Sequence, residues 1–281
     1  MKQGYWVVRT YESGIIGEKT KFWVQGERPA GAKSRRKEKQ DIRKQEQNEY
    51  SAIKRMARLL HANYQQGDLI LGLDYSETGM EKITGRARKE HTDFDSATEE
   101  EQADMIWEAA WHEASLCLRR VARAMAEQGQ ELQYILVTSD MDGDTGERVR
   151  VHHHLIVKAG CQQLFLQKWG KLGSVDWSPI SKQADYTPIA EYLIKQVRRI
   201  PDAKKFRSSR NLIRPQPKDR VVLTDAELRI PKGGKLLFRQ EYKSWGASVY
   251  QPQYIRYIIP EEKRRKPAVP GGRSDGEEKG L

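Results

Sequence analysis

The stretch Val-His-His-His-Leu-Ile-Val, residues 151–157, places three of the six histidines of the chain at the head of an aliphatic run. A short run of this kind is typical of a β-strand. Side chains alternate between the two faces of a strand, so His152 and His154 share one face, about 6–7 Å apart, and His153 points to the other. Two neutral imidazoles on one face suit a divalent metal ion with open positions for a substrate. The alternative is three ordinary histidines in a half-buried strand.

The charge of the chain points to a polyanionic partner. Its 281 residues include 50 Lys and Arg against 39 Asp and Glu, a net charge of +11. Nucleic acid is the simplest partner for such a chain, and an anionic membrane surface is the other candidate. No apolar run approaches the roughly 18 residues that span a bilayer, and the N-terminus lacks the apolar segment of a signal peptide. Two widely separated cysteines, Cys117 and Cys161, favour reduced thiols in the cytoplasm.

Residues 1–66 predict a β-hairpin followed by a long basic helix. Two short runs of aromatic and β-branched residues on either side of a glycine-containing turn predict the hairpin. Apolar residues recur at helical spacing over residues 33–66. The polar face of this helix carries many cations, including Arg35 and Arg36, and two interpretations stay open: contacts with DNA phosphates, or a solvated helix face.

Residues 67–217 predict the central domain of the chain. The polar segment 76–95 is expected to be a loop. Ser96 and Glu99 have the spacing of a capping box, so the following helix is expected to start at Ser96. Periodicity and turn residues predict strands at 68–75, 132–138, 149–157 and 175–179, and helices at 96–127, 161–169 and 184–199.

The C-terminal part of the chain predicts further strands and a tail. Three arginines in the basic loop at the end of the central domain would add phosphate contacts; they are Arg207, Arg210 and Arg214. Residues 218–259 predict a strand-rich extension. Residues 260–281 are charged, contain Pro and Gly, and lack apolar periodicity, so we expect a disordered tail.

The helix expected at 184–199 carries a tyrosine and a lysine at the spacing of one helical turn, Tyr192 and Lys195. A divalent metal ion polarises a phosphodiester oxygen, and a tyrosine hydroxyl then attacks to form a phosphotyrosine. The lysine would bind the phosphate or stabilise its developing charge. A tyrosine that merely packs at a helix edge gives the same pattern, and Tyr186 lies at the start of the same helix.

Taken together, these residues resemble the HUH endonucleases. The histidine strand looks like their His-hydrophobic-His motif, with His153 in the middle position. The segment AEYLIKQ, residues 190–196, is similar to the Tyr-x-x-Lys motif of single-tyrosine rolling-circle replication initiators. The segment DLILGLDYS, residues 68–76, is similar to the strand that opens their catalytic sheet, and FRSSRNLIRPQP, residues 206–217, resembles a segment of replication-associated proteins from bacterial plasmids, phages and integrative elements.

This resemblance implies an α+β fold with a central antiparallel sheet, a ferredoxin-like (RRM-like) palm, and helices packed on one face. It implies that His152 and His154 bind Mn²⁺ or Mg²⁺, that Tyr192 is the nucleophile, and that Lys195 assists at the phosphate or metal. The family often places a third ligand, a glutamate, on the strand before the histidines. The candidates for that ligand here, in order of preference, are Asp140, Asp142, Asp74 and Glu147.

The implied activity is nicking of single-stranded origin DNA, extruded as a hairpin. It would leave a 5′-phosphotyrosine and a 3′-OH that a host polymerase extends, and a second transesterification would religate the strand. The chain has no G-x-x-x-x-G-K-[ST] loop, so a host helicase would unwind the DNA. The expected location is the cytoplasm of a bacterial host. Alternatives are an HUH relaxase or transposase, a metal-dependent hydrolase that uses water, and a non-catalytic DNA-binding regulator.

Overall fold

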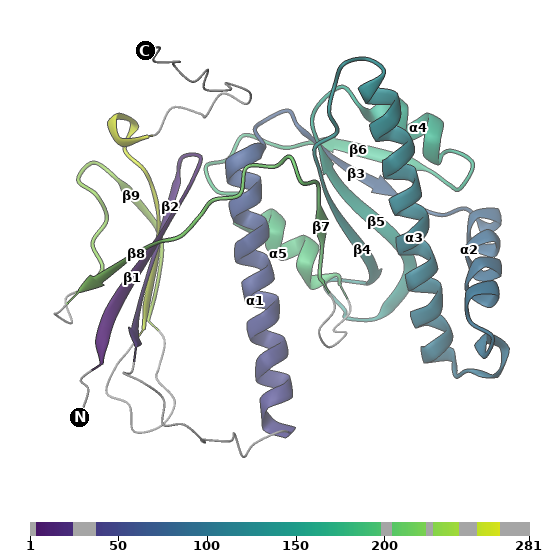
Figure 1. Cartoon of the computed structure of the whole chain (residues 1–281), viewed down its shortest axis with the longest axis horizontal. Coiled ribbons are helices and arrows are strands. Elements are labelled where there is room, and N and C mark those ends of the chain that lie inside the picture. Colours follow the sequence, from purple (N-terminus) through teal and green to yellow (C-terminus); the bar gives the residue numbers. More distant parts are fainter. Residues whose placement is uncertain (1–3, 25–37, 198–203, 223–226, 242–251, 265–281) are drawn as a thin grey trace, which may run out of the picture. The chain divides into compact units, whose positions relative to one another are not determined.

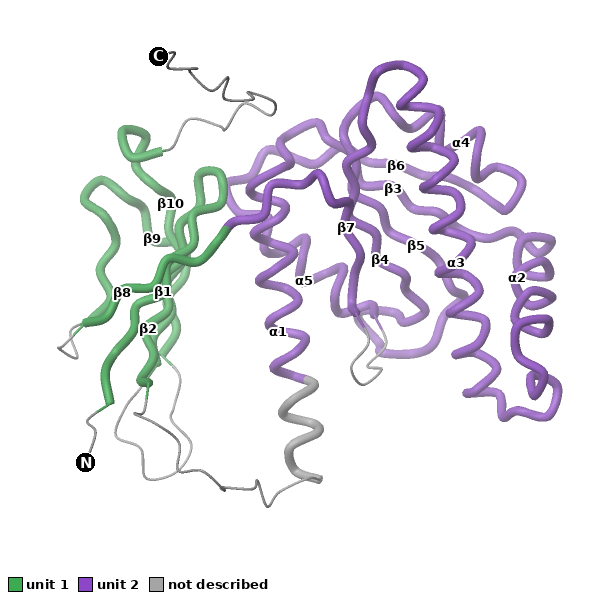
Figure 2. Tube along the Cα trace, in the orientation of Figure 1, with its two compact units in different colours: residues 1–27, 216–281 green, residues 28–215 purple. Residues whose placement is uncertain are grey.

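The computed structural model describes residues 4–24, 38–197, 204–222, 227–241 and 252–264, with the backbone alone for residues 38–45 (Figure 1). The chain divides into two compact units, which Figure 2 colours separately. One unit joins residues 1–27 to residues 216–281, and the other is residues 28–215. The two ends of the chain therefore fold together, which differs from the four consecutive segments that we predicted.

The unit made from both chain ends is a five-stranded antiparallel sheet in the order β8-β1-β2-β10-β9. The predicted N-terminal hairpin is present, and its turn includes Gly14 with a φ of 57°. Tyr257 and Ile255 form its small core with Leu228 and Ile259. The strands are β1 (Tyr5–Ser13), β2 (Ile16–Val24), β8 (Lys218–Val222), β9 (Lys235–Glu241) and β10 (Gln253–Ile258). A 3-10 turn, Glu261–Lys263, opens the segment that we expected to be disordered, and residues 265–281 lie outside the described residues.

The second unit contains the histidine strand at the centre of its own antiparallel sheet. The order is β6-β3-β5-β4-β7, and the histidines lie on β5. The predicted α+β fold with a central antiparallel sheet is therefore confirmed. The strands are β3 (Leu69–Leu73), β4 (Tyr134–Met141), β5 (Arg148–Val157), β6 (Val175–Pro179) and β7 (Arg207–Ser208).

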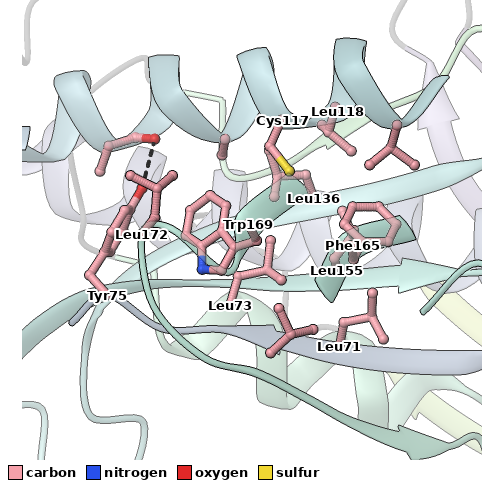
Figure 3. Packing of buried hydrophobic residues seen from close by; sticks show 14 of the residues in the cluster. Leu71, Leu73, Tyr75, Cys117, Leu118, Leu136, Leu155, Phe165, Trp169 and Leu172 are labelled. Carbon is pink, nitrogen blue, oxygen red and sulfur yellow. Dashed lines mark hydrogen bonds between the residues drawn. The ribbon is translucent and has the colours of Figure 1, made fainter. Parts of the chain in front are cut away.

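Helices cover both faces of this sheet, whereas we predicted helices on one face. Leu136 and Leu155 pack with α2, α3 and α4, as Figure 3 shows for α3 and α4. Ile135 and Ile156 face the opposite way and pack with α1 and α5. Both faces carry helices because β4 and β5 are apolar at consecutive positions, not only at alternate ones. The helices are α1 (Glu38–Asn63), α2 (Glu77–Glu90), α3 (Glu99–Ala126), α4 (Gln162–Trp169) and α5 (Thr187–Lys195).

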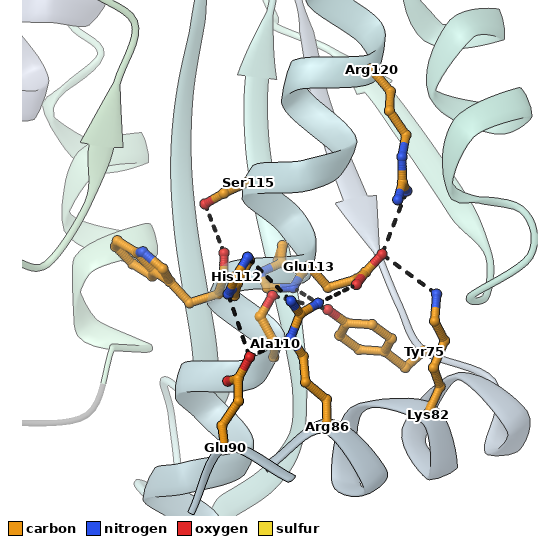
Figure 4. Close-up of polar contacts among 11 residues, drawn as sticks. Tyr75, Lys82, Arg86, Glu90, Ala110, His112, Glu113, Ser115 and Arg120 are labelled. Carbon is orange, nitrogen blue, oxygen red and sulfur yellow. Dashed lines mark hydrogen bonds and ion pairs between the residues drawn. The ribbon is translucent and has the colours of Figure 1, made fainter.

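The segment predicted as a loop at 76–95 contains α2, so that prediction is wrong. Few of its residues are buried, among them Ile83 and Ala87, which leaves no clear apolar periodicity in the sequence. Its attachment to α3 is polar instead. The buried carboxylate of Glu113 forms ion pairs with Arg86 at 2.9 Å and with Lys82 at 3.6 Å (Figure 4).

The start of α3 also differs from the prediction. Thr98, not Ser96, caps the helix: its Oγ1 accepts from the backbone N–H of Glu101 at 3.3 Å. The Glu101 carboxylate in turn accepts from the backbone N–H of Thr98 at 2.8 Å. Ser96 ends a short 3-10 turn, Phe94–Ser96, that precedes the cap.

Candidate active site

The alternation of side chains along β5 separates the three histidines as predicted. His152 and His154 are half-buried on the α5 face of the sheet, and their Nε2 atoms lie 3.2 Å apart. The Nδ1 of His152 lies 3.0 Å from the carbonyl oxygen of Arg150. A carbonyl only accepts, so this Nδ1 carries the proton and the Nε2 of the neutral ring keeps its lone pair. That tautomer is the one a metal-binding imidazole needs.

His153 lies on the opposite face and has a structural environment. Its Nε2 is 2.8 Å from the Tyr75 hydroxyl and its Nδ1 is 2.9 Å from the Thr138 hydroxyl. The ring also makes an edge-on contact with Trp169. Burial, followed by the neighbouring His152 and His154, lowers the pKa of His153 to about 3. Both of its nitrogens are therefore engaged in the core, away from the other two histidines.

A third polar group joins His152 and His154, and the sequence analysis assigned it no role. The Oε1 of buried Gln196 lies 2.7 Å from His154 Nε2. The Ser139 hydroxyl donates to the Gln196 backbone carbonyl at 2.6 Å, which fixes this residue at the end of α5. Its position, four residues after Tyr192, is the signal that could have revealed it, because residues i and i+4 share a helix face.

Tyr192 is the tyrosine that α5 presents beside the histidines. Its side chain is 59% exposed and its ring centroid lies 6.2 Å from that of His154. Tyr186, in contrast, is buried and stacked on the ring of His61, and burial raises its pKa. Lys195 ends α5 and is exposed, and no carboxylate of the described residues forms an ion pair with it.

Among the acidic candidates, Asp74 has the most direct relation to the histidine pair. It follows β3, in which Gly72 pairs with His154, so Gly72 and Asp74 lie on the histidine face. Glycine leaves space there, since a Cβ at Gly72 would have no atom nearer than the Asp74 Oδ2 at 3.9 Å. Burial and then His152 lower the pKa of His154, and smaller contributions from Gln196 and Asp74 oppose them.

Two of the other acidic candidates, Asp140 and Asp142, have partners of their own. Asp140, the preferred candidate from the sequence, is buried at a β-bulge with its Oδ2 3.8 Å from Arg148 Nε. Asp142 accepts from two backbone N–H groups of its own turn at 2.8 Å, and these hydrogen bonds lower its pKa. Glu147 is exposed in the same turn.

The geometry fits a divalent ion. Two ligands about 2.1 Å from one ion and at right angles to each other lie roughly 3.0 Å apart, close to the spacing of the two imidazole nitrogens. Within the described ranges, no three His, Cys, Asp or Glu side chains group closely enough to hold a metal. The amide oxygen of Gln196 already lies beside His154, so it is the best-placed third protein ligand, and Asp74 offers a carboxylate on the same face.

The structure describes three of the five arginines predicted to bind DNA. Arg35 and Arg36 lie outside the described residues. Arg214 holds its own loop, donating to the carbonyl of Ser209 at 2.8 Å. Arg210 is exposed, and Arg207 lies at the edge strand β7.

Comparison with known proteins adds no relative: no protein-family model, no curated protein and no solved structure matches this chain. The resemblance to the HUH endonucleases therefore depends on the two motifs and on the order in which they occur. In the part of the chain that the structure describes, no helix combines the length and apolar content needed to cross a bilayer.

Proposed function

We propose that this protein is a rolling-circle replication initiator of the HUH type, which nicks and religates single-stranded DNA through Tyr192. The observation that supports the proposal most is the position of this exposed tyrosine, with its ring 6.2 Å from that of His154. His154 and His152 in turn face each other through their Nε2 atoms. A nucleophile and a candidate metal site therefore occupy one patch of the sheet face.

In the proposed reaction, the Tyr192 Oη attacks the scissile phosphorus. The Oη–P bond forms as the bond from phosphorus to the 3′-oxygen breaks, which leaves the 5′ end on the enzyme and a free 3′-OH. The tyrosine proton passes to solvent, and the departing oxygen takes one up. A Mn²⁺ or Mg²⁺ ion held by His152 and His154 would polarise a phosphate oxygen. Lys195, one turn from the nucleophile, supplies positive charge for the phosphate.

His152 has the tautomer that a metal-binding imidazole needs, whereas His154 donates its Nε2–H to Gln196 and would have to carry its proton on Nδ1 instead when a metal ion binds. Metal binding requires neutral imidazoles. Burial, followed by the neighbouring His152, lowers the pKa of His154, which favours the neutral form of this ring. Gln196 accepts at His154 and its own backbone is held by Ser139, so α5 is tied to the strand that carries the histidines.

The wider setting belongs to the same proposal. The net charge of +11 supports single-stranded DNA at an origin hairpin as the substrate. A host polymerase would extend the 3′-OH and a host helicase would unwind the duplex, in the cytoplasm of a bacterium. An HUH relaxase or transposase would share the chemistry, and the DNA that is cleaved distinguishes them.

The test is formation of a covalent protein–DNA adduct. Labelled single-stranded DNAs, including the locus around the gene for this chain, are incubated with the protein and Mn²⁺ and resolved on denaturing gels. We expect an adduct with the wild type that is lost in Tyr192→Phe and in His152→Ala/His154→Ala. Tyr5→Phe is the matched control, because Tyr5 is also exposed, at 41%, and lies in the other unit.

Three other results would each contradict the proposal. Cleavage without an adduct would indicate a metal-dependent hydrolase that uses water. Binding without cleavage on every DNA, the cognate locus included, would indicate a DNA-binding regulator. An adduct that persists in Tyr192→Phe would mean that another residue is the nucleophile.

A further inference from the structure

A second feature of unit 28–215 lies between α3 and the β4–β7 edge of the sheet. It is an open groove of about 570 Å³. Tyr134 comes from β4 and Arg207 from β7, and the remaining wall comes from α3. This groove lies on the face covered by α3, whereas His152 and His154 lie on the face covered by α5. It is therefore separate from the candidate active site.

Arg207 is held in place at the centre of this groove. Its guanidinium carbon lies 4.2 Å from the ring centroid of Trp111, and its Nη1 donates to the Ser115 hydroxyl at 2.7 Å. Ser115 donates in turn to the Trp111 carbonyl at 2.8 Å, so the hydroxyl is used in both directions (Figure 4 shows Ser115 on α3). Trp107 extends the stack, with its ring centroid 5.0 Å from that of Trp111. Among the described residues, Ser115 alone accepts a hydrogen bond from the Arg207 guanidinium, so its other N–H groups can bind a ligand.

The charge of the groove is uncompensated. Arg119 on α3 also lines it, and neither Arg119 nor Arg207 forms an ion pair with a carboxylate of the described residues. Arg207 is exposed, and desolvation by the groove lowers its pKa slightly from the ordinary arginine value without removing its charge. An anion placed between these two arginines would restore the lost interactions.

Aromatic walls beside the arginines narrow the choice of anion. Bases of single-stranded nucleic acids stack on aromatic rings and on arginine planes, while arginines bind the adjoining phosphates. Arg207, whose plane lies over the Trp111 ring, and Tyr134 supply the stacking surfaces, and Arg119 and Arg207 supply the charge. An acidic peptide would use the charge but not the stacking surfaces.

We propose that this groove binds one or two nucleotides of single-stranded DNA, as a second contact site on the face of the sheet opposite the histidines. β7 is the edge strand of the described sheet and only β4 separates it from β5, so β7 and β5 are about two strand spacings, roughly 10 Å, apart within the sheet. A single strand that passes around the β7 edge would reach both the groove and the histidine pair. The inference rests on the proposed function only in taking single-stranded DNA as the partner.

The test uses the full chain in EDTA, so that binding is measured without cleavage. Fluorescence anisotropy reports the affinity for a labelled oligothymidylate over a range of salt concentrations. For Arg119→Gln/Arg207→Gln we expect a loss of about ten-fold in affinity, and a salt dependence of log K that is shallower by roughly 1.4, or 0.7 for each lost phosphate contact. The control Lys171→Gln/Lys232→Gln removes the same charge at exposed positions outside the groove and should bind like the wild type.

A second measurement needs no variant. An oligonucleotide that carries 5-iododeoxyuridine is photocrosslinked to the wild type, and the crosslinked peptides are mapped by mass spectrometry. We expect crosslinks at Trp111 or Tyr134. Crosslinks confined to other regions, or a double variant that binds like its control, would overturn the inference. So would an oligoglutamate peptide that binds the groove while oligothymidylate does not, because the partner would then be an acidic protein.

Adduct formation with Mn²⁺ is scored separately on the same variants. If the wild type forms an adduct but Arg119→Gln/Arg207→Gln binds DNA like its control, this inference is overturned and the proposed function stays in place. If the double variant binds DNA more weakly but the wild type forms no adduct, the proposed function is overturned and this inference stays in place.

Discussion

At the residue scale, three consecutive histidines have two different environments. The sequence predicted this division from side-chain alternation alone, because a strand places neighbours on opposite faces. It could not predict the partners. Tyr75 and Thr138 bind His153 from segments far from it in the chain, and Gln196 approaches His154 from α5. The order of preference among the acidic ligands failed for the same reason, since Asp74 lies beside the histidines only through the pairing of β3 with β5.

The buried state of His153 predicts a pH dependence of stability. Its pKa is about 3 in the folded protein, against about 6.5 for an unfolded histidine. Between these values the unfolded chain binds a proton that the folded chain does not, so stability falls as the pH falls from about 6.5 toward 3. The slope from this residue is at most about 1.4 kcal/mol per pH unit.

Urea unfolding at a series of pH values checks this dependence. His153→Gln removes the titrating group, so its free energy of unfolding should approach that of the wild type as the pH falls below 6.5. His112→Gln, a change at an exposed histidine, should leave the wild-type slope intact. Parallel curves for the wild type and His153→Gln would show that His153 does not titrate as described.

Gln196 gives a second prediction at this scale. Removing its amide oxygen in Gln196→Ala should weaken Mn²⁺ binding by about 10- to 100-fold, the range typical for groups that complete or support a metal site. Calorimetric titration with Mn²⁺ measures the change. Gln128→Ala, at an exposed position after α3, is the control. Equal affinity in Gln196→Ala and the wild type would remove Gln196 from the site.

At the scale of elements, strong periodicity was enough for prediction and weak periodicity was not. The apolar repeat predicted α3, and the β-branched runs predicted β4 and β5 as a hairpin. α2 was missed because a polar pair, Arg86 with Glu113, does much of the anchoring that apolar residues do in other helices. A two-residue strand such as β7 leaves no pattern at all, and it pairs with β4 only in the folded chain.

The start of α3 allows a direct test of local sequence signals. Two overlapping motifs, at Ser96 and at Thr98, have the spacing of a capping box, and the structure uses the second. Thr98→Ala should therefore lower the free energy of unfolding by about 1 kcal/mol, the usual cost of losing such a cap. Ser96→Ala should change it by a few tenths at most, because its hydroxyl donates to the Asp93 carbonyl at an exposed site. Thermal unfolding measures both changes. A larger loss of stability in Ser96→Ala than in Thr98→Ala would place the helix start at Ser96.

At the scale of the whole molecule, the division into two units was the feature furthest from the reach of the sequence. Local patterns located the N-terminal hairpin and the C-terminal strands, but only folding pairs β1 with β8 and β2 with β10. The segment boundaries that we predicted followed chain order, and the structure follows strand pairing instead. α1 belongs to the second unit, where it packs with α5.

This division predicts which truncations fold. Every residue of the two core clusters in unit 28–215 lies between Ala52 and Leu212. A chain of residues 28–215 should therefore fold alone, elute as a compact species in size-exclusion chromatography, and keep its α+β circular dichroism. Residues 1–215 would retain β1 and β2 without the strands that flank them, and two uncovered edges should make that chain aggregate. Aggregation of 28–215, with 1–215 well behaved, would contradict the division.

The central claim is that Tyr192 forms a covalent bond to DNA, and peptide mapping tests it most directly. The wild type is allowed to react with its cognate single strand and Mn²⁺, the DNA is digested to a short remnant, and the tryptic peptides are analysed by mass spectrometry. We predict a nucleotide mass on the peptide that contains Tyr192, and its absence when His152 and His154 are both replaced by alanine. A remnant on any other residue, or strand cleavage with no modified peptide, would contradict the account.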